Sequence, residues 1–357
     1  MAINAIAHVI GTGTIGEPLI GLLCSLKEQL GIEEVTFHKR TPLLHDRSKV
    51  RSLIAKGAKL CVDDEAAKGF QDLDMEPTYE AIEAINRAGV VIDCTPSGVG
   101  TANKTKYYEK FISNTAGFIA QGSEFGFGKP YARGVNDAAL VRGEDRFIQV
   151  VSCNTHNLSI LIETLALADG GPANLVDGRF VCMRRANDIS QVGSFIPSPQ
   201  VGKHKDPRFG THHARDAWHL FQTLGYDLDL FSTAIKLNTQ YMHTIFFDVK
   251  VKNPTTVDRL LERIHANDRV AVTWKDSANM VFSFGRDQGH YGRILNVTVI
   301  AVPSLMVRNG NEIVGYCFTP QDGNSLLSSI SAATWLLYPD DYEDRVQCLG
   351  QFFYDEV

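Results

Sequence analysis

In the first part of the chain, short apolar runs alternate with longer segments in which apolar residues recur at helical spacing. The apolar run at 5–10 is followed by a periodic segment at 19–30 and by a second apolar run at 34–37. Short apolar runs separated by amphipathic helices are typical of a parallel sheet with helices on both faces. Further apolar runs lie at 90–92, 117–124 and 146–151. The pattern predicts a Rossmann-type, doubly wound α/β domain over residues 1–152.

The second half of the chain has a different pattern, in which apolar and polar residues alternate. Alternation is typical of strands with one buried face, so a second, α+β domain built on a mainly antiparallel sheet is predicted over residues 153–321. The segments that carry the alternation are 244–251, 269–274, 280–284, 296–301 and 312–318. Residues 322–357 have apolar residues at helical spacing, and we expect them to pack back on the first domain.

Residues 150–169 join the two patterns. The spacing of Leu158, Leu161, Ile162 and Leu165 predicts a helix with one face in a core, and Cys153 lies at its start. A helix start favours a negative charge, so a thiol there is biased toward its nucleophilic thiolate form. The alternative is that Cys153 is a small buried hydrophobic residue.

A glycine-rich turn follows the first predicted strand. Gly11, Gly13 and Gly16 stand in a G-x-G-x-x-G pattern between a strand and a helix, with Thr14 and Ile15 inside it. In this context the glycines permit a tight turn, close approach of a pyrophosphate and close helix packing. We therefore predict a dinucleotide site here, and the alternative is a tight turn without a ligand.

The residues after the second predicted strand bear on the choice of cofactor. A site that prefers NAD usually places an acidic residue there, whereas this chain has Lys39, Arg40 and Thr41. Positive charge favours a 2′-phosphate, so NADP is the preferred cofactor and NAD remains possible. The alternative is a solvated basic loop.

Later turns in the same domain predict the other half of the cofactor site. Open parallel sheets bind ligands beyond the carboxyl ends of their strands. The residues placed there by the pattern are Thr95, Pro96, Gly98, Gly100, Gln121 and Gly122.

Composition excludes several classes of protein. The 357 residues carry a formal net charge of −6, which argues against a nucleic-acid partner. Seven scattered cysteines, an odd number, favour a reducing compartment, and we expect the cytoplasm. No apolar run reaches the about 18 residues of a membrane span. A zinc site at Cys153, His156, His212 and His213 is disfavoured because neither HExxH nor paired CxxC occurs.

The chain resembles the archaeal-type (type II) glyceraldehyde-3-phosphate dehydrogenases over nearly its whole length. The resemblance rests on ordered motifs, namely GTGTIG at 11–16, KRTP at 39–42, DCTPSGVG at 93–100, QGSE at 121–124, VSCNT at 151–155, RRAND at 184–188, HHARD at 212–216 and YMHT at 241–244. It implies that Cys153 attacks the aldehyde carbon and that His243 is the base. Asn154 and the Cys153 amide are candidates for holding the oxyanion.

The resemblance also implies substrates, cofactor and assembly. A phosphorylated aldehyde and inorganic phosphate would be bound by residues that suit phosphate oxygens. The candidates are Thr155, His156, Arg184, Arg185, His212 and His213. The family further implies NADP or NAD, a thioester intermediate, an acyl-phosphate product and a homotetramer.

Some positions depart from the family pattern. SCNT is followed here by His156 and Asn157, where a second Thr is common, Arg40 replaces a small hydroxyl residue, and residues 289–297 fit loosely. Two alternatives follow. One is a related thioester-forming semialdehyde or acyl-phosphate reductase, and the other is a catalytically silent NADP-binding regulator.

Overall fold

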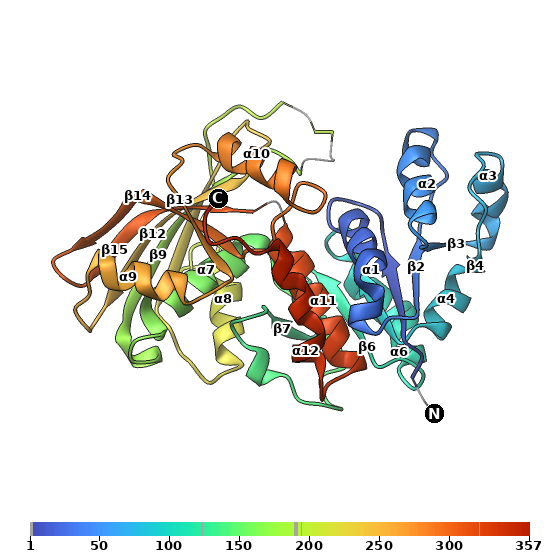
Figure 1. Ribbon diagram of the computed structural model, residues 1–357, viewed down its shortest axis with the longest axis horizontal. Coiled ribbons are helices and arrows are strands. Elements are labelled where there is room, and N and C mark those ends of the chain that lie inside the picture. Colours follow the sequence, from blue (N-terminus) through green and yellow to red (C-terminus); the bar gives the residue numbers. More distant parts are fainter. Residues whose placement is uncertain (1–2, 123, 189–191, 194, 321) are drawn as a thin grey trace. The chain divides into compact units, whose positions relative to one another are not determined.

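The computed structural model describes residues 3–122, 124–188, 192–193, 195–320 and 322–357 (Figure 1). These residues form two compact units. Unit 1 contains the described residues within 1–131, 140–150 and 326–350, and unit 2 contains those within 132–139, 151–325 and 351–357.

Unit 1 is built on an eight-stranded sheet in which every pair of neighbours is parallel. The strands lie in the order β4-β3-β2-β1-β5-β6-β8-β7. Their bounds are β1 Ile6–Ile10, β2 Glu34–His38, β3 Lys59–Val62, β4 Tyr79–Glu80, β5 Val90–Asp93, β6 Gly117–Gln121, β7 Lys129–Tyr131 and β8 Phe147–Val150. The central strands β1, β5 and β6 are buried at every position, as expected for a sheet covered on both faces. The predicted Rossmann-type fold is confirmed.

The helices of unit 1 connect and cover these strands. They are α1 Gly16–Leu30, α2 Arg47–Ala55, α3 Ala67–Gln71, α4 Ala81–Arg87, α5 Val99–Asn103, α6 Glu109–Phe111 and α12 Tyr342–Val346, with the larger part of α11, Gly323–Leu337. Tyr338, which follows α11, donates a hydrogen bond to the carbonyl oxygen of Gly31 at 2.5 Å. Helices α11 and α12 provide the helical character predicted for the C-terminal segment.

Unit 2 is built on a seven-stranded mixed sheet in the order β10-β11-β9-β12-β15-β14-β13. The β11–β9 and β13–β14 pairs are parallel and the others antiparallel, as the alternating pattern predicted. The strands are β9 Leu175–Arg184, β10 Gln200–Val201, β11 Leu230–Lys236, β12 His243–Val251, β13 Val270–Thr273, β14 Thr298–Arg308 and β15 Glu312–Thr319.

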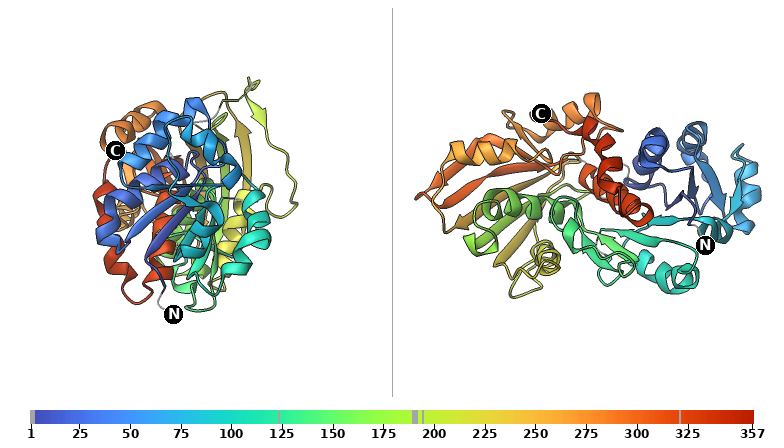
Figure 2. Two further views of the ribbon diagram at one scale, coloured as in Figure 1. Left: turned by 90° about the vertical axis from the view of Figure 1, so that its right-hand side faces the viewer. Right: turned by 60° about the horizontal axis from the view of Figure 1, so that its bottom comes forward.

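Helices cover this second sheet (Figure 2). They are α7 Cys153–Ile162 with its π-helical continuation η5 Glu163–Leu167, α8 His212–Gln222, α9 Val257–His265 and α10 Ala278–Gln288. Helix α7 contacts β9, β14 and β15, α8 contacts β11, and α9 contacts β13 and β14. Along β12, alternate residues are buried, so one face of the strand points into a core.

The segment predicted as a strand at 280–284 is a helix instead. It lies inside α10, where Val281 and Gly285 are buried one turn apart and Ala278, Phe282 and Phe284 pack against the same apolar cluster. The alternation of Met280, Phe282 and Phe284 is real in the sequence, but packing selected the helical period.

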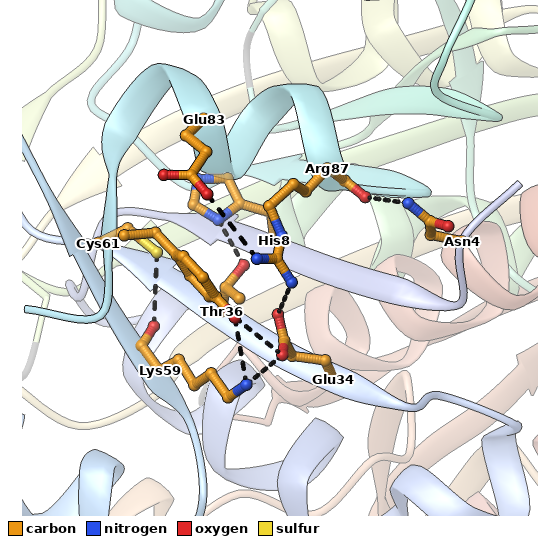
Figure 3. A network of polar contacts seen from close by, with 9 residues as sticks. Asn4, His8, Glu34, Thr36, Lys59, Cys61, Glu83 and Arg87 are labelled. Carbon is orange, nitrogen blue, oxygen red and sulfur yellow. Dashed lines mark hydrogen bonds and ion pairs between the residues drawn. The ribbon is translucent and has the colours of Figure 1, made fainter.

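Polar contacts join strands β1, β2 and β3 and helix α4 of unit 1 (Figure 3). His8, in the middle of β1, lies with its Nδ1 2.7 Å from Thr36 Oγ1 of β2. Glu34 accepts hydrogen bonds from Lys59 and from Arg87. The His8 ring is fully buried, and burial, followed by the charge of His38, lowers its pKa to about 3.

We expect His8 to make folding sensitive to acid. The ordinary pKa of histidine is about 6.5, so between pH 6.5 and 3 the unfolded chain binds a proton that the folded chain does not. The free energy of unfolding therefore falls as pH drops through this range. From pH 7 to 5 the contribution of His8 amounts to about 2 kcal/mol. Denaturant unfolding at both pH values should show this loss in the wild type.

The His8→Asn variant should show about 2 kcal/mol less destabilisation between the two pH values. His45→Asn is the matched control, because His45 is exposed, and it should keep the wild-type pH dependence. An unchanged pH dependence in His8→Asn would contradict a buried neutral imidazole.

Candidate active site

Cys153 is the first residue of α7, as the sequence predicted. Ser152 caps this helix, because its Oγ accepts a hydrogen bond from the Thr155 amide at 3.4 Å and lies 2.9 Å from Thr155 Oγ1. The prediction that only one face of the helix lies in a core is wrong: every residue from Asn154 to Ile162 is buried. The helix start is thus embedded in unit 2, with the thiol only partly exposed.

Charged residues of unit 2 surround the thiol. Burial raises the pKa of Cys153 to about 12, and the negative charge of Asp322 acts in the same direction, while Arg185 and Arg184 oppose it. The bias toward thiolate expected from the helix start is therefore outweighed in the free protein. The thiol is protonated at neutral pH and must lose its proton before it can attack a carbonyl.

His243 begins β12 and is buried. Its Nδ1 accepts a hydrogen bond from the backbone N–H of Arg185 at 3.0 Å. Burial, followed by the charge of Arg185, lowers the pKa of His243 to about 3, so the imidazole is neutral. Because Nδ1 is an acceptor, the ring proton lies on Nε2, and His243 presents a hydrogen-bond donor there.

The two arginines predicted to bind phosphate differ in their surroundings. The Arg185 side chain is buried and paired with Asp188 at 2.9 Å and with Asp322 at 3.0 Å. Arg184 forms no ion pair with a carboxylate of the described residues, and its buried Nε has no hydrogen-bond partner among them. A planar donor without a partner is suited to phosphate oxygens, so Arg184 is the better candidate.

The paired histidines lie at the start of α8 with their ring centroids 4.0 Å apart. His213 places Nδ1 3.1 Å from Thr211 Oγ1 and Nε2 3.3 Å from Asn154 Nδ2. Burial lowers the pKa of His213 well below its ordinary value, and the charges of His212, Arg184 and His243 add to this effect. Residues from four elements, α7, β9, α8 and β12, are thus brought together inside unit 2.

The side chains that follow Cys153 in the helix are directed into the fold. His156 is fully buried, its Nδ1 lies 3.1 Å from the Ser152 carbonyl oxygen, and burial lowers its pKa to about 4. Asn157 donates to Thr319 Oγ1 at 2.8 Å. Substrate contacts by Thr155 and His156 stay predictions.

Sequence reasoning missed several charged residues near the thiol and the histidines. Asp322 pairs with Arg185, and Asn324 Nδ2 donates to the Cys153 carbonyl oxygen at 3.0 Å. Lys205 and Arg215 lie close enough to His212 to lower its pKa, after burial, which is the main cause. Arg215 belongs to the HHARD motif at 212–216, whereas Asp322, Asn324 and Lys205 stand in no recognisable spacing, so only the fold reveals these three.

The predicted cofactor residues all lie in unit 1, at or after the carboxyl ends of the neighbouring strands β2, β1, β5 and β6. Gly11 has a φ of +96°, and a side chain at Gly16 would meet the Gly11 carbonyl oxygen at 2.1 Å. Nothing lies within 4 Å of the position a Cβ would take at Gly13. The turn is therefore tight where the helix packs and open where a pyrophosphate would approach, so these residues fit a dinucleotide.

Two further turns belong to the same edge. Glu124 accepts hydrogen bonds from the amides of Gly98 and Thr101 and thereby fixes the turn that contains Pro96 and Gly100. Gln121 Nε2 donates to Ser329 Oγ at 2.5 Å, and its buried Oε1 finds no partner among the described residues. Ser123 of the same motif lies outside the described residues.

The basic segment 39–41, which follows β2, is less available to bind a ligand than its sequence suggests. Lys39 pairs with Asp46 at 2.7 Å, and Asp46 also pairs with Lys49 at 2.8 Å. Hydrogen bonds from Lys39 and Lys49 outweigh the partial burial of Asp46 and lower its pKa to about 2. Arg40 and Thr41 are exposed, so they are the residues of this segment best placed for a ligand.

Comparison with known proteins agrees with this geometry. The chain is 30% identical over 274 residues to a glyceraldehyde-3-phosphate dehydrogenase of Methanobacterium bryantii, covering 73% of this chain and 71% of that protein. It belongs to the archaeal-type glyceraldehyde-3-phosphate dehydrogenase family. Dehydrogenases of the same name from Metallosphaera sedula and Sulfolobus acidocaldarius are 28% and 27% identical, over 72% and 85% of this chain and 72% and 83% of theirs.

No family model matches the chain. This archaeal-type dehydrogenase has no cluster of three or more histidine, cysteine or acidic side chains able to hold a metal ion within the described ranges. Its described helices are all too short or too polar to cross a bilayer. The family resemblance drawn from the ordered motifs is confirmed, and the protein is an oxidoreductase by its relatives.

Proposed function

We propose that the protein oxidises glyceraldehyde 3-phosphate, with NADP or NAD and inorganic phosphate, to 1,3-bisphosphoglycerate, in a reversible reaction. The observation that carries this proposal is the group formed by Cys153, His243 and Arg184 in a chain of this family. The group combines a nucleophile, a hydrogen-bond donor for an oxyanion and an unpaired guanidinium for a phosphate.

The chemistry assigned to Cys153 is nucleophilic. The Cys153 thiol first gives its proton to water, the sulfur then bonds to the aldehyde carbon, and the carbonyl oxygen becomes an oxyanion. Hydride then leaves that carbon as the carbonyl re-forms, which gives a thioester. An oxygen of inorganic phosphate attacks the thioester, the carbon–sulfur bond breaks, and the thiolate is regenerated with release of the acyl phosphate.

His243 is assigned to the oxyanion because of its tautomer. With Nδ1 engaged by Arg185, the Nε2–H can donate to a developing negative charge. The base role expected from the sequence requires an unprotonated Nε2, so it needs the other tautomer. The Cys153 amide and Asn154 are proposed as further donors.

The phosphate of the substrate and the inorganic phosphate are assigned to the basic residues near Cys153 and His243. Arg184 is the proposed clamp, with His212, His213, Lys205 and Arg215 adding polar and positive groups nearby. Arg185 is not proposed as a phosphate ligand, because its side chain is paired with the carboxylates of Asp188 and Asp322.

A nicotinamide cofactor, when bound, would supply the hydride acceptor. Gly11, Gly13 and Gly16 would admit its pyrophosphate at the start of α1, and Gln121 offers a buried oxygen without a partner among the described residues. The proposed preference for NADP rests on Arg40, because Lys39 is held by Asp46.

We expect Arg40→Ala to weaken NADP binding by about tenfold, the effect of losing one charge-assisted contact of about 1.4 kcal/mol, and to leave NAD binding nearly unchanged. Calorimetric titration with each cofactor measures both constants. Arg51→Ala removes another exposed arginine of unit 1 and should bind both cofactors like the wild type. Tighter binding of NAD than of NADP by the wild type would refute the preference.

Substrate assays test the activity itself. Purified protein with NADP and phosphate should produce NADPH from glyceraldehyde 3-phosphate, and omission of phosphate should stop turnover after the thioester forms. A related reductase would instead favour another aldehyde. Because His156 stands where a Thr is usual, a screen of other aldehydes belongs to the test. A cofactor-binding regulator would bind NADP and turn over none of the aldehydes.

A further inference from the structure

Asp322 adopts a backbone conformation that side chains rarely take. Its φ is +62°, in the left-handed region, and its side chain is buried. The next residue, Gly323, is packed so closely that a Cβ there would lie 1.8 Å from the Ile294 carbonyl oxygen. Strained backbone of this kind persists only where the surrounding structure enforces it, and it is concentrated at functional sites.

The Asp322 carboxylate is connected to His243 through one residue. Its two oxygens lie 3.0 and 3.3 Å from the same terminal nitrogen of Arg185. The backbone amide of Arg185 in turn donates to His243 Nδ1. A displacement of Arg185 would therefore move the group that fixes the orientation and the tautomer of His243.

The same turn also reaches the nucleophile. Asn324, two residues after Asp322, donates from Nδ2 to the carbonyl oxygens of Cys153 at 3.0 Å and of Val297 at 3.3 Å. The segment 322–324 thus contacts the backbone of the nucleophile on one side and the arginine that holds the imidazole on the other. All of these residues belong to unit 2.

We propose that Asp322 is a positioning residue for the reaction, which, through Arg185 and the turn it shares with Asn324, sets the placement of His243 relative to Cys153. The proposal rests on the proposed function. The ion pair of Asp322 and Arg185 must be intact for this role. Removal of one partner of a buried ion pair leaves an uncompensated charge, and the surrounding structure rearranges to satisfy it.

The variant Asp322→Asn tests the proposal, because asparagine tolerates the left-handed conformation and keeps the size of the side chain while it removes the charge. We expect kcat to fall about 10- to 100-fold, the range for misplaced catalytic groups, with KM for the aldehyde within threefold of the wild type. Asp74→Asn is the matched control, because Asp74 also has a positive φ (53°) and pairs with an arginine, Arg47, but is exposed and lies in unit 1. It should retain wild-type kcat.

A second readout separates positioning from general damage. The charged groups that act on the Cys153 thiol are Asp322, Asp188, Arg185 and Arg184. Loss of the Asp322 charge leaves the arginines less compensated, so the thiol pKa should fall. Alkylation of Cys153 by iodoacetamide at pH 7, followed by peptide mass, should then be about threefold faster for a decrease of one pKa unit, because the thiolate fraction rises while the nucleophilicity of each thiolate falls.

Lower kcat together with faster alkylation supports the proposal. A folded Asp322→Asn variant with kcat within threefold of the wild type overturns it, and so does a lower kcat with unchanged alkylation. If Asp322→Asn does not fold, Asp322→Glu decides: it keeps the charge but shifts the carboxylate, so wild-type alkylation with kcat lowered at least about fivefold supports the proposal, and wild-type kcat overturns it. Should the wild type oxidise no aldehyde, the proposed function fails, while the alkylation result still reports on Asp322.

Discussion

Replacement of Cys153 by serine is expected to lower the rate of aldehyde oxidation by at least about 10⁴-fold, the range found when a catalytic nucleophile is removed. A serine hydroxyl is far less acidic than a thiol, and its ester would not conserve the energy of the thioester. NADPH formation under saturating aldehyde, NADP and phosphate measures the effect.

A matched control and a direct observation of the intermediate sharpen this test. Cys348→Ser changes another partly exposed cysteine, in unit 1, and should leave turnover intact. Without phosphate, the wild type should release about one NADPH per active site and carry an acyl group on the peptide that contains Cys153. Turnover by the serine variant within tenfold of the wild type would exclude a mechanism that requires the Cys153 thiol.

Local patterns were sufficient to predict most of the fold. The run at 5–10, the glycine turn and the helix after it are contiguous in sequence, and the structure contains them as β1, the turn and α1. The helix that starts at Cys153 was predicted on the same grounds. The error at 280–284 arose where alternation and helical spacing coexist in a short apolar segment, because tertiary packing, which the sequence does not display, decides between them.

The charges at the site could not be predicted in the same way. Asp322 stands 137 residues from Arg185, and Asp46 holds Lys39 across a connecting loop of the sheet. Each pair changes the role of a basic residue that the sequence had marked as a phosphate ligand. Ion pairs between distant positions have no periodicity, and only folding shows which basic side chains remain available.

Burial also changed the electrostatic interpretation of Cys153. The helix start stabilises a negative charge by about 0.3–1 kcal/mol in exposed positions, whereas a pKa near 12 means that desolvation and Asp322 together act in the opposite direction and dominate. The sequence shows the helix but not its surroundings. It therefore indicates the stabilisation of the thiolate by the helix start, which is the smaller effect, and not the burial of the thiol, which is the larger.

His243→Ala is expected to lower kcat/KM by about 10²- to 10³-fold, the cost of losing one oxyanion donor. His243→Gln is expected to recover at least about tenfold of that loss, because its amide can place an N–H near the position of Nε2 but cannot accept a proton at neutral pH. Steady-state kinetics of both variants, with His265→Gln as an exposed-histidine control, measure the difference.

The comparison of the two variants distinguishes the roles of His243. If the imidazole acts as the base, glutamine is as inactive as alanine, since neither can take the proton. The contact between the Arg185 N–H and Nδ1 favours the donor role. If His243 acts as this donor, kcat/KM of the glutamine variant is higher than that of the alanine variant. The donor role also explains why a pKa near 3 is compatible with activity. Throughout the neutral range the imidazole is uncharged and carries its one proton on Nε2, from which it can donate to an oxyanion.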